Sequence, residues 1–289
     1  FSQKLETSIQ RGHRSSVLAL ALNSPQTILA SGSRDKSIIL WDVATRKQIR
    51  VLTGHTASVK SLAFIPKSNL LISGANDQRV LLWDIESGKL LQEITKCEDV
   101  ISSVAVHPSL PLVAIGGHSF TIDIYNYKTF ELIKQIPTEP DKSMGMGVQV
   151  SFSEDGTLLL TGEDDKKAKA YTVEGFNQTK EFKNTYGWCG GCGTHLQMDP
   201  QNKFIAKLAH KDSVRIYDVL GNQQLARIGR DYSEISNIVF SPSSTNLYFA
   251  ADDTLFELDY VNRTFGKKID LKPFNCGSVP DILYLNDKK

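Results

Sequence analysis

The residue types best suited to metal or redox chemistry gather in one glycine-rich stretch. Cys189, Cys192 and His195 follow the pattern C-x2-C-x2-H, a spacing that can present thiolates and an imidazole to zinc, or a dithiol to redox chemistry. A fourth zinc ligand is not evident, because Cys97 and Cys276 are remote in the sequence. The alternative is a connecting loop whose cysteines are small, partly buried residues. We expect no metal and no cofactor.

A second group that could take part in a reaction is acidic. Glu163, Asp164 and Asp165 are consecutive, and paired carboxylates can act as general acid and base. Together with His118 or His210 they would form the reactive centre of an enzyme. Such an acidic run is also typical of a solvated turn, and no combination of nucleophile, base and orienting group is evident in the sequence. We therefore expect a protein that is not an enzyme.

The secondary-structure elements that must position these residues are indicated by an internal repeat in the sequence. The stretch from Gly12 to Asp42 closely resembles the stretch from Gly54 to Asp84, which begins 42 residues later. In both copies a His precedes the Trp by 28 residues, and an Asp precedes that Trp by 6. A period near forty that opens on Gly-His and closes on Trp-Asp indicates one four-stranded propeller blade per copy.

The two copies resemble the WD-repeat β-propeller family. This resemblance implies a polar tetrad inside each well-formed blade, which by position comprises His13, Ser31, Asp35 and Trp41, and then His55, Ser73, Asp77 and Trp83. A buried Asp needs hydrogen-bond donors, which a His, a hydroxyl and an indole N–H can supply, while the Trp ring adds apolar area. We interpret these residues as structural rather than catalytic.

The repeat predicts an all-β propeller that forms one domain over residues 1–289. Six blades are expected at residues 16–52, 58–95, 100–136, 147–183, 193–228 and 234–271. Residues 278–289 are expected to begin a seventh blade, and the resemblance implies that an outer strand within residues 1–10 completes the last blade. We favour seven blades with the last one incomplete in this chain, and a six-bladed ring with an irregular tail is the second choice. The chain begins at Phe1 rather than Met, which indicates a fragment or a processed chain.

Composition limits the classes of partner. A formal net charge of +1 over 289 residues gives no global field that would attract nucleic acid or an anionic membrane. No apolar run approaches the roughly 18 residues needed to span a bilayer, so we expect a soluble protein without membrane insertion. The scattered cysteines do not resemble the disulfide framework of a small secreted domain, which favours the cytosol or the nucleus.

One repeated turn supplies the main candidates for partner binding. The position seven residues before the Trp or Tyr of the first five blades is always polar or charged, and it holds Arg34, Asn76, His118, Asp164 and His210. In a propeller this turn connects the second and third strands near the mouth of the central channel. The alternative is that these residues are polar because turns are polar in any protein.

An arginine group and an aromatic pair are further candidates. Bidentate contacts to an acidic or phosphorylated peptide could come from arginines on one side of the first two blades, namely Arg11, Arg14, Arg34 and Arg79. Tyr186 and Trp188 are the best candidates for exposed anchors, because Tyr, Trp and Arg dominate interface hot spots. The alternatives are a solvated surface for the arginines and core packing for the Trp.

The leading hypothesis, which the resemblance implies, is a non-catalytic scaffold for protein interactions. It would bind peptide segments or subunits of a multiprotein complex through its loops and channel mouth. Two loops that depart from the repeat, at residues 137–147 and 183–195, are the expected places for partner-specific contacts. The alternatives are a nucleic-acid or phosphoinositide binding module, which the near-zero net charge disfavours, and a propeller enzyme.

Overall fold

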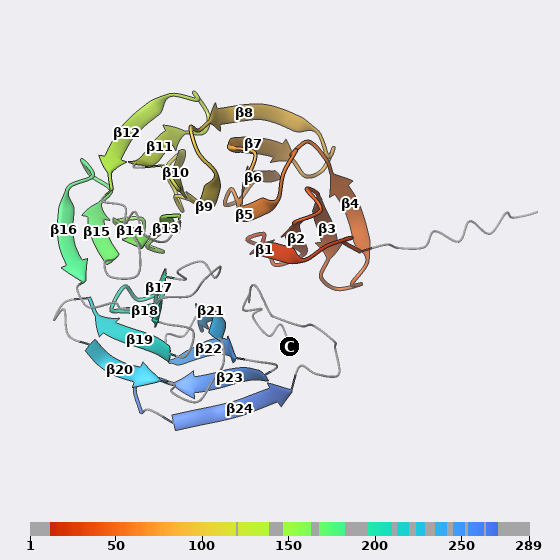
Figure 1. Cartoon of the computed structure of the whole chain (residues 1–289). Helices are drawn as coiled ribbons and strands as arrows, with labels where there is room; N and C mark the ends of the chain where they lie inside the picture. Colours follow the sequence, from red (N-terminus) through yellow and green to blue (C-terminus); the bar gives the residue numbers. More distant parts are fainter. Residues whose placement is uncertain are drawn as a thin grey trace, which may run out of the picture.

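The fold is an all-β propeller (Figure 1). A computed structural model of the chain describes residues 12–119, 121–138, 147–162, 168–182, 196–209, 213–219, 224–228, 235–241, 245–251, 254–262 and 264–270. These residues form 24 strands in six antiparallel sheets of four, and the sheets follow one another around a ring. Within the described residues, no helix is long and apolar enough to cross a membrane.

Each of the first three blades contributes four consecutive strands. The first blade contains β1 (Val17–Leu22), β2 (Ile28–Ser33), β3 (Ile38–Asp42) and β4 (Gln48–Leu52). The second contains β5 (Val59–Phe64), β6 (Leu70–Ala75), β7 (Arg79–Asp84) and β8 (Leu90–Lys96). The third contains β9 (Ile101–Val106), β10 (Leu112–Gly117), β11 (Thr121–Asn126) and β12 (Leu132–Pro137).

The last three blades repeat the same order. The fourth contains β13 (Gln149–Phe152), β14 (Leu158–Gly162), β15 (Ala168–Thr172) and β16 (Gln178–Phe182). The fifth contains β17 (Leu196–Met198), β18 (Phe204–Ala209), β19 (Ser213–Asp218) and β20 (Gln224–Ile228). The sixth contains β21 (Ile235–Phe240), β22 (Asn246–Ala251), β23 (Thr254–Asp259) and β24 (Thr264–Asp270).

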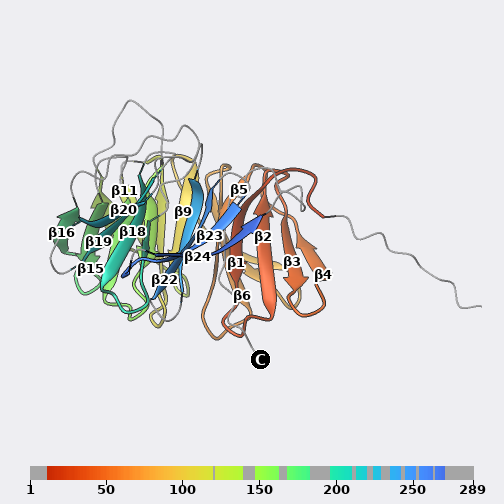
Figure 2. The same ribbon diagram turned by 90° about the horizontal axis from the view of Figure 1, so that it is seen from below.

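The first strand of each blade lies nearest the ring axis, and the fourth lies on the rim (Figure 1). In the view of Figure 2 the strands run from one face of the ring toward the other. Because neighbouring strands are antiparallel, the turn between the second and third strands lies on one face, and the other two turns lie on the opposite face. We call the face with the turns at residues 33–37, 75–78 and 117–120 the mouth face.

Apolar runs form the inner and middle strands because these strands lie between two blades. In β6, for example, every residue from Leu71 to Ala75 is buried. The rim strands instead expose part of their apolar side chains, as Ile49 and Leu91 do. An inner strand that is apolar on both pleat faces, such as the VLALAL run of β1, therefore fits a place between packed sheets.

A repeated glycine allows neighbouring blades to approach closely. Gly32, Gly74 and Gly116 occupy equivalent positions, 42 residues apart, in the second strands of the first three blades. A Cβ atom on Gly32 would lie 2.7 Å from Cγ1 of Val59, and one on Gly74 would lie 2.6 Å from Cγ2 of Ile101. Each of these contacts is with the inner strand of the next blade. The packing of one blade against the next therefore requires the absence of a side chain at this position.

The favoured prediction of seven blades is corrected, because the described residues form six complete blades, as in the second choice. The physical reason is the length of the repeat: one blade takes up about forty residues, and residues 17–270 accommodate six of them. The segments expected to close the ring and to begin a seventh blade, residues 1–10 and 278–289, lie outside the described residues.

We predict that Gly74→Ala destabilises the propeller. The added methyl group would overlap Ile101 and Val104 of the third blade, and overpacking of this kind costs about 1–3 kcal/mol in free energy of unfolding. The matched control is Gly12→Ala, where a Cβ atom would make only an ordinary contact of 3.9 Å with the Trp41 ring. Chemical denaturation of both variants measures the difference. Equal free energies of unfolding would contradict the role assigned to Gly74.

Candidate interaction site at the mouth of the propeller

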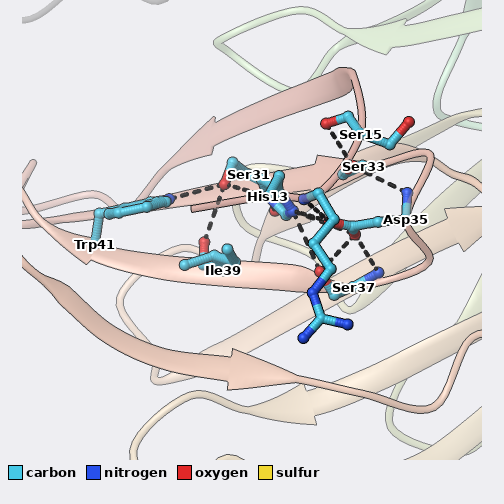
Figure 3. Close-up of polar contacts among 9 residues, drawn as sticks. His13, Ser15, Ser31, Ser33, Asp35, Ser37, Ile39 and Trp41 are labelled. Atoms are coloured by element: carbon cyan, nitrogen blue, oxygen red, sulfur yellow. Dashed lines mark hydrogen bonds and ion pairs between the residues drawn. The ribbon is translucent and has the colours of Figure 1, made fainter. Parts of the chain in front are cut away.

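The first tetrad is a continuous hydrogen-bonded network (Figure 3). His13 lies between Asp35 and Ser31, with its Nδ1 3.0 Å from Oδ2 of Asp35 and its Nε2 2.8 Å from the Ser31 Oγ. The indole N–H of Trp41 donates to the same Ser31 hydroxyl over 2.8 Å. Ser37 donates to the Asp35 carboxylate through its backbone N–H and its hydroxyl. The network thus links the segment before β1 to β2, β3 and the turn between them.

The second tetrad repeats this geometry in the second blade. The Nδ1 of His55 lies 2.9 Å from Oδ2 of Asp77, and its Nε2 lies 2.7 Å from the Ser73 Oγ. The indole N–H of Trp83 donates to Ser73 over 2.8 Å. The positions that the resemblance assigned from sequence are therefore joined by hydrogen bonds in both blades.

The two tetrads differ in exposure. Trp83 is 1% exposed and packs in one cluster with Ala19, Ala30 and Leu40 of the first blade. Trp41 is partly exposed, because among the described residues the first blade packs closely against a neighbouring blade on one side only. Water can reach the first network more easily than the second.

The proton positions follow from the chemistry of the groups. A carboxylate can only accept, so the Nδ1–H of His55 donates to Asp77, and the bare Nε2 accepts from the Ser73 hydroxyl. Burial lowers the pKa of His55, against the opposing effect of Asp77. Burial alone would raise the pKa of Asp77, but the hydrogen bonds from the Thr56 N–H and from His55 outweigh it and lower this pKa. At neutral pH the pair is therefore a neutral imidazole beside an ionised carboxylate.

The order Ser, His, Asp is also that of a catalytic triad, in which a His removes the proton of a nucleophilic Ser. In the second blade, however, Ser73 is 0% exposed and its oxygen already accepts the Trp83 N–H. A substrate carbonyl has no access to such an oxygen. The tetrads therefore brace the blades, and the Ser73 hydroxyl is not available as a nucleophile.

The tetrad carboxylates hold the turns on the mouth face. Asp35 accepts the backbone N–H of Arg14 over 2.7 Å, and Asp77 accepts the backbone N–H of Thr56 over 2.7 Å. Asp77 also accepts the backbone N–H of Arg79, at the start of β7. Each carboxylate thus ties its own turn to the segment that precedes the inner strand. The residue just before each Asp, Arg34 or Asn76, is fixed in place as a consequence.

Three predicted mouth residues occupy equivalent positions in the structure. The backbone N–H groups of Arg34, Asn76 and His118 donate to the carbonyl oxygens of Ser16, Ser58 and Val100, over 2.9, 2.9 and 3.1 Å. The side chain of Arg34 is exposed, and those of Asn76 and His118 are partly exposed. The mouth face therefore presents a different polar side chain on the same backbone frame in each of the first three blades.

His118 lies where the third blade meets the fourth. A Cβ atom on Gly147 would lie 2.7 Å from Cδ2 of His118 and would also overlap Ser102. The hydroxyl of Ser102 in turn donates to the carbonyl oxygen of Val148 over 2.9 Å. The imidazole thus stands beside a hydrogen bond that joins two blades.

Of the four arginines proposed as one binding group, Arg79 has partners within its own blade, and the hypothesis itself stays a prediction. The Nε of Arg79 donates to Oε2 of Glu93 on β8 over 2.6 Å, and its Nη1 donates to the carbonyl oxygen of Gly54 over 3.0 Å. These bonds tie the second blade together and occupy the guanidinium. Arg14 and Arg34 are exposed, and Arg11 lies outside the described residues.

Several sequence candidates fall outside the described residues and stay predictions. They are the acidic run with Asp164, the histidine His210, the aromatic pair Tyr186 and Trp188, and the metal candidates Cys189, Cys192 and His195. In the part of the chain that the structure describes, no group of three or more His, Cys, Asp or Glu residues could hold a metal ion.

Sequence reasoning missed Lys60, a half-buried lysine in the inner strand β5. Burial, and then the positive charge of Arg34, lower the pKa of this ammonium group from its ordinary value. The available signal was the repeat itself, since Lys60 stands 42 residues after Leu18 and 42 residues before Ser102. At this inner-strand position the first repeat has an apolar residue and the third has a small one, so a charged residue in the second repeat departs from the pattern.

Comparison with known families agrees with this architecture. A family model described as WD domain, G-beta repeat, matches residues 4–42 and 46–84, which contain both hydrogen-bonded tetrads. Over these residues the chain matches WD repeats, and its six sheets have the architecture of a WD-repeat propeller. Propellers of this family generally serve as non-catalytic scaffolds for protein interactions. A search of curated proteins found no match to the chain.

We predict that Ser73→Ala destabilises this propeller more than Ser31→Ala does. Without the Ser73 hydroxyl, the buried indole N–H of Trp83 and the Nε2 of His55 lose their shared partner. Leaving such groups unsatisfied costs about 1–3 kcal/mol, whereas water can replace part of the loss around the more exposed Trp41. Urea denaturation of the two variants tests this order, and equal losses would speak against it.

The protonation states predict a loss of stability in acid. The pKa of His55 is lower in the folded chain than its ordinary value of 6.5, so the unfolded chain takes up this proton first as the pH falls. The free energy of unfolding should decrease as the pH falls through 6.5. The lowered pKa values of Asp77 and Asp35 add a second decrease as the pH falls below 3.8.

The variant His55→Gln isolates the first decrease. Its free energy of unfolding at neutral pH should be lower, and its further loss between about pH 7 and pH 5 should be smaller than that of the unaltered chain. Urea midpoints across this range provide the measurement. The same pH slope in both proteins would show that the folded chain binds the His55 proton as readily as the unfolded chain does.

Proposed function

We propose that the protein is a non-catalytic interaction scaffold that binds peptide segments or subunits of a larger complex at its mouth face. The observation that carries this proposal is the set of equivalent turns with Arg34, Asn76 and His118. Their backbone hydrogen bonds are the same in three blades, while their side chains differ in charge, size and hydrogen-bonding capacity.

This arrangement separates structural from variable positions. The tetrad residues hold the turns and are occupied by one another. Arg34, Asn76 and His118 are not members of the tetrads, and they lie at the surface of the mouth face. A rigid scaffold that displays unlike polar groups on surface turns is suited to the recognition of a partner.

The tetrad residues also make an enzyme the less favoured function. The Ser, His and Asp groups of the first two blades would be the natural acid, base and nucleophile, but they brace the blades. Nucleic-acid binding finds no support in the net charge of +1, because affinity for a phosphate backbone depends on an excess of Lys and Arg.

A site-specific photo-crosslinker tests the proposal. Placed at Asn76 on the mouth face, it should capture a protein partner from a lysate of the native cells. The same crosslinker at Thr45, in the exposed β3–β4 turn on the opposite face, is the matched control. A triple variant with Arg34→Ala, Asn76→Ala and His118→Ala should lose most of the partner in affinity purification, because alanine removes the side-chain contacts of three blades.

Unfolding midpoints of the triple variant and the unaltered chain establish that the fold is retained. Partner capture that is unchanged in the triple variant, together with stronger crosslinking at Thr45 than at Asn76, would contradict binding at the mouth face. Recovery of nucleic acid in place of protein would contradict the scaffold itself.

A further inference from the structure

Lys60 is the extra residue of a β-bulge. In the pairing of β5 with β6, Val59 lies opposite Ala75 and Ser61 lies opposite Gly74, so Lys60 has no partner on the neighbouring strand. A bulge of this kind turns a side chain out of the regular pleat. It lies at the end of β5 that is next to the mouth face, since the Ser58 carbonyl just before it accepts the N–H of Asn76.

Equivalent bulges occur in the first and third blades, and they show that the fold does not require a cation there. Leu18 is the extra residue between Val17 and Ala19 in β1, and Ser102 is the extra residue in β9. The Ser102 hydroxyl bonds to carbonyl oxygens of Val148 and Gly116. One position thus holds an apolar residue, one holds a satisfied hydroxyl, and only Lys60 is charged.

Arg34 lies close enough to Lys60 for the two charges to interact. Arg34 lies two residues after Gly32, and Lys60 directly follows Val59. These two segments pack on each other, because a Cβ atom on Gly32 would overlap Val59. Burial and the nearby Arg34 charge both lower the pKa of Lys60. The two like charges therefore repel each other across the junction of the first and second blades.

Neither cation has a counter-charge in the described part of the chain. The ion pairs found among these residues are those of His13 with Asp35, His55 with Asp77 and Arg79 with Glu93. The side-chain nitrogens of Lys60 and Arg34 make no hydrogen bond to another described residue, in contrast to Arg50 and Arg79, which bond to carbonyl or carboxylate oxygens. A partly buried charge is normally paired, and Lys60 is partly buried without such a partner among the described residues.

We infer that Lys60 and Arg34 form a binding site for one anionic side chain of a peptide that docks on the mouth face. The ligand group is a carboxylate or a phosphate, since both offer oxygen acceptors to an ammonium and a guanidinium at once. This inference rests on the proposed function, and it adds the charge of the partner and the junction of the first two blades as the point of contact.

A peptide fits these observations better than a nucleic acid does. A polyanion is held by many cations in a row, whereas the cations beside Lys60 and Arg34 are the exposed Arg14 and Lys36 of the same first blade, and the uncharged Asn76 and His118 follow around the mouth face. One pair can neutralise one anionic group. The neighbouring polar side chains are then available for uncharged parts of the peptide.

The affinities of fluorescent peptides for the chain test this inference. The probes are three short peptides of equal length that contain glutamate, phosphoserine or glutamine at the same central position. The unaltered chain should bind the glutamate or the phosphoserine peptide more tightly than the glutamine peptide, and comparison of the first two identifies the preferred anion. The double variant Lys60→Gln with Arg34→Gln should bind the preferred anionic peptide about tenfold or more weakly, because charge-assisted contacts are lost.

The matched control removes two charges from the opposite face. Lys47 and Lys89 are exposed, lie 42 residues apart and precede the rim strands β4 and β8. The double variant Lys47→Gln with Lys89→Gln has the same net charge as the mouth variant, and it should bind all three peptides as the unaltered chain does. A loss in both double variants would show only general charge attraction and would overturn the inference.

Stability supplies a second readout. If Lys60 is kept for binding, Lys60→Met should leave the unfolding midpoint unchanged or raise it, because an unpaired and partly buried charge is removed. A lower midpoint would show that the ammonium group supports the fold, and it would contradict the role assigned to Lys60.

The inference and the proposed function fail in different ways. If neither anionic peptide binds more tightly than the glutamine peptide, or if a single-stranded oligonucleotide binds more tightly than both, the inference is overturned. Crosslinking at Asn76 can still support the scaffold in the first of these cases. If anionic peptides bind through Lys60 while native partners attach to the opposite face, the inference about the site stands and the proposed function fails.

Discussion

The structure depends on the hydrogen bonding of a partly buried carboxylate in each of the first two blades. Asp77 accepts from a histidine ring, from the backbone of the preceding segment and from the backbone of its own turn. A carboxylate away from water is stable only when several donors surround it. The positions of the histidine, the turn and the inner strand are therefore mutually fixed, and the Ser and Trp extend this order to the third strand.

The same constraint determines what the mouth face can do. In the first two blades the carboxylate already holds the turn, so the frame does not depend on the side chain of the residue before it, Arg34 or Asn76. Arg34, Asn76 and His118 share a backbone hydrogen bond and differ in everything beyond it. Such a division allows side chains to change from blade to blade without loss of the frame, which is a suitable basis for the recognition of a partner.

The Lys60 and Arg34 pair, in contrast to the tetrads, lowers the stability of the folded chain. It opposes folding through repulsion and burial, and a site of this kind is consistent with the general exchange of stability for function.

The sequence predicted the local parts of this arrangement correctly. The propeller fold and the equivalence of the mouth turns follow from a period of 42 residues, because residues one period apart occupy the same place in successive blades. The members of both tetrads were implied by the resemblance to the WD-repeat family, and the spacing alone does not show them. The favoured number of blades was wrong, since a repeat fixes the unit and not how many units complete a ring. The bond of Arg79 to Glu93 was not predicted, for a related reason. This bond depends on how β7 pairs with β8, and bulges in that pairing are not visible in the spacing.

By itself the sequence determined which residues are equivalent and which turn of each blade is polar, and its resemblance to the WD-repeat family implied which side chains join within a blade. These relations involve residues that the chain brings together within one repeat. Only the tertiary structure decided which polar groups stay exposed and which charges meet across blades. The exposure of Trp41 relative to Trp83, and the approach of Lys60 to Arg34, depend on the packing of one sheet against the next. That packing depends on side-chain volumes and on the close contact of Gly32 with Val59, and the spacing of residues along the chain does not show which groups it brings together across blades.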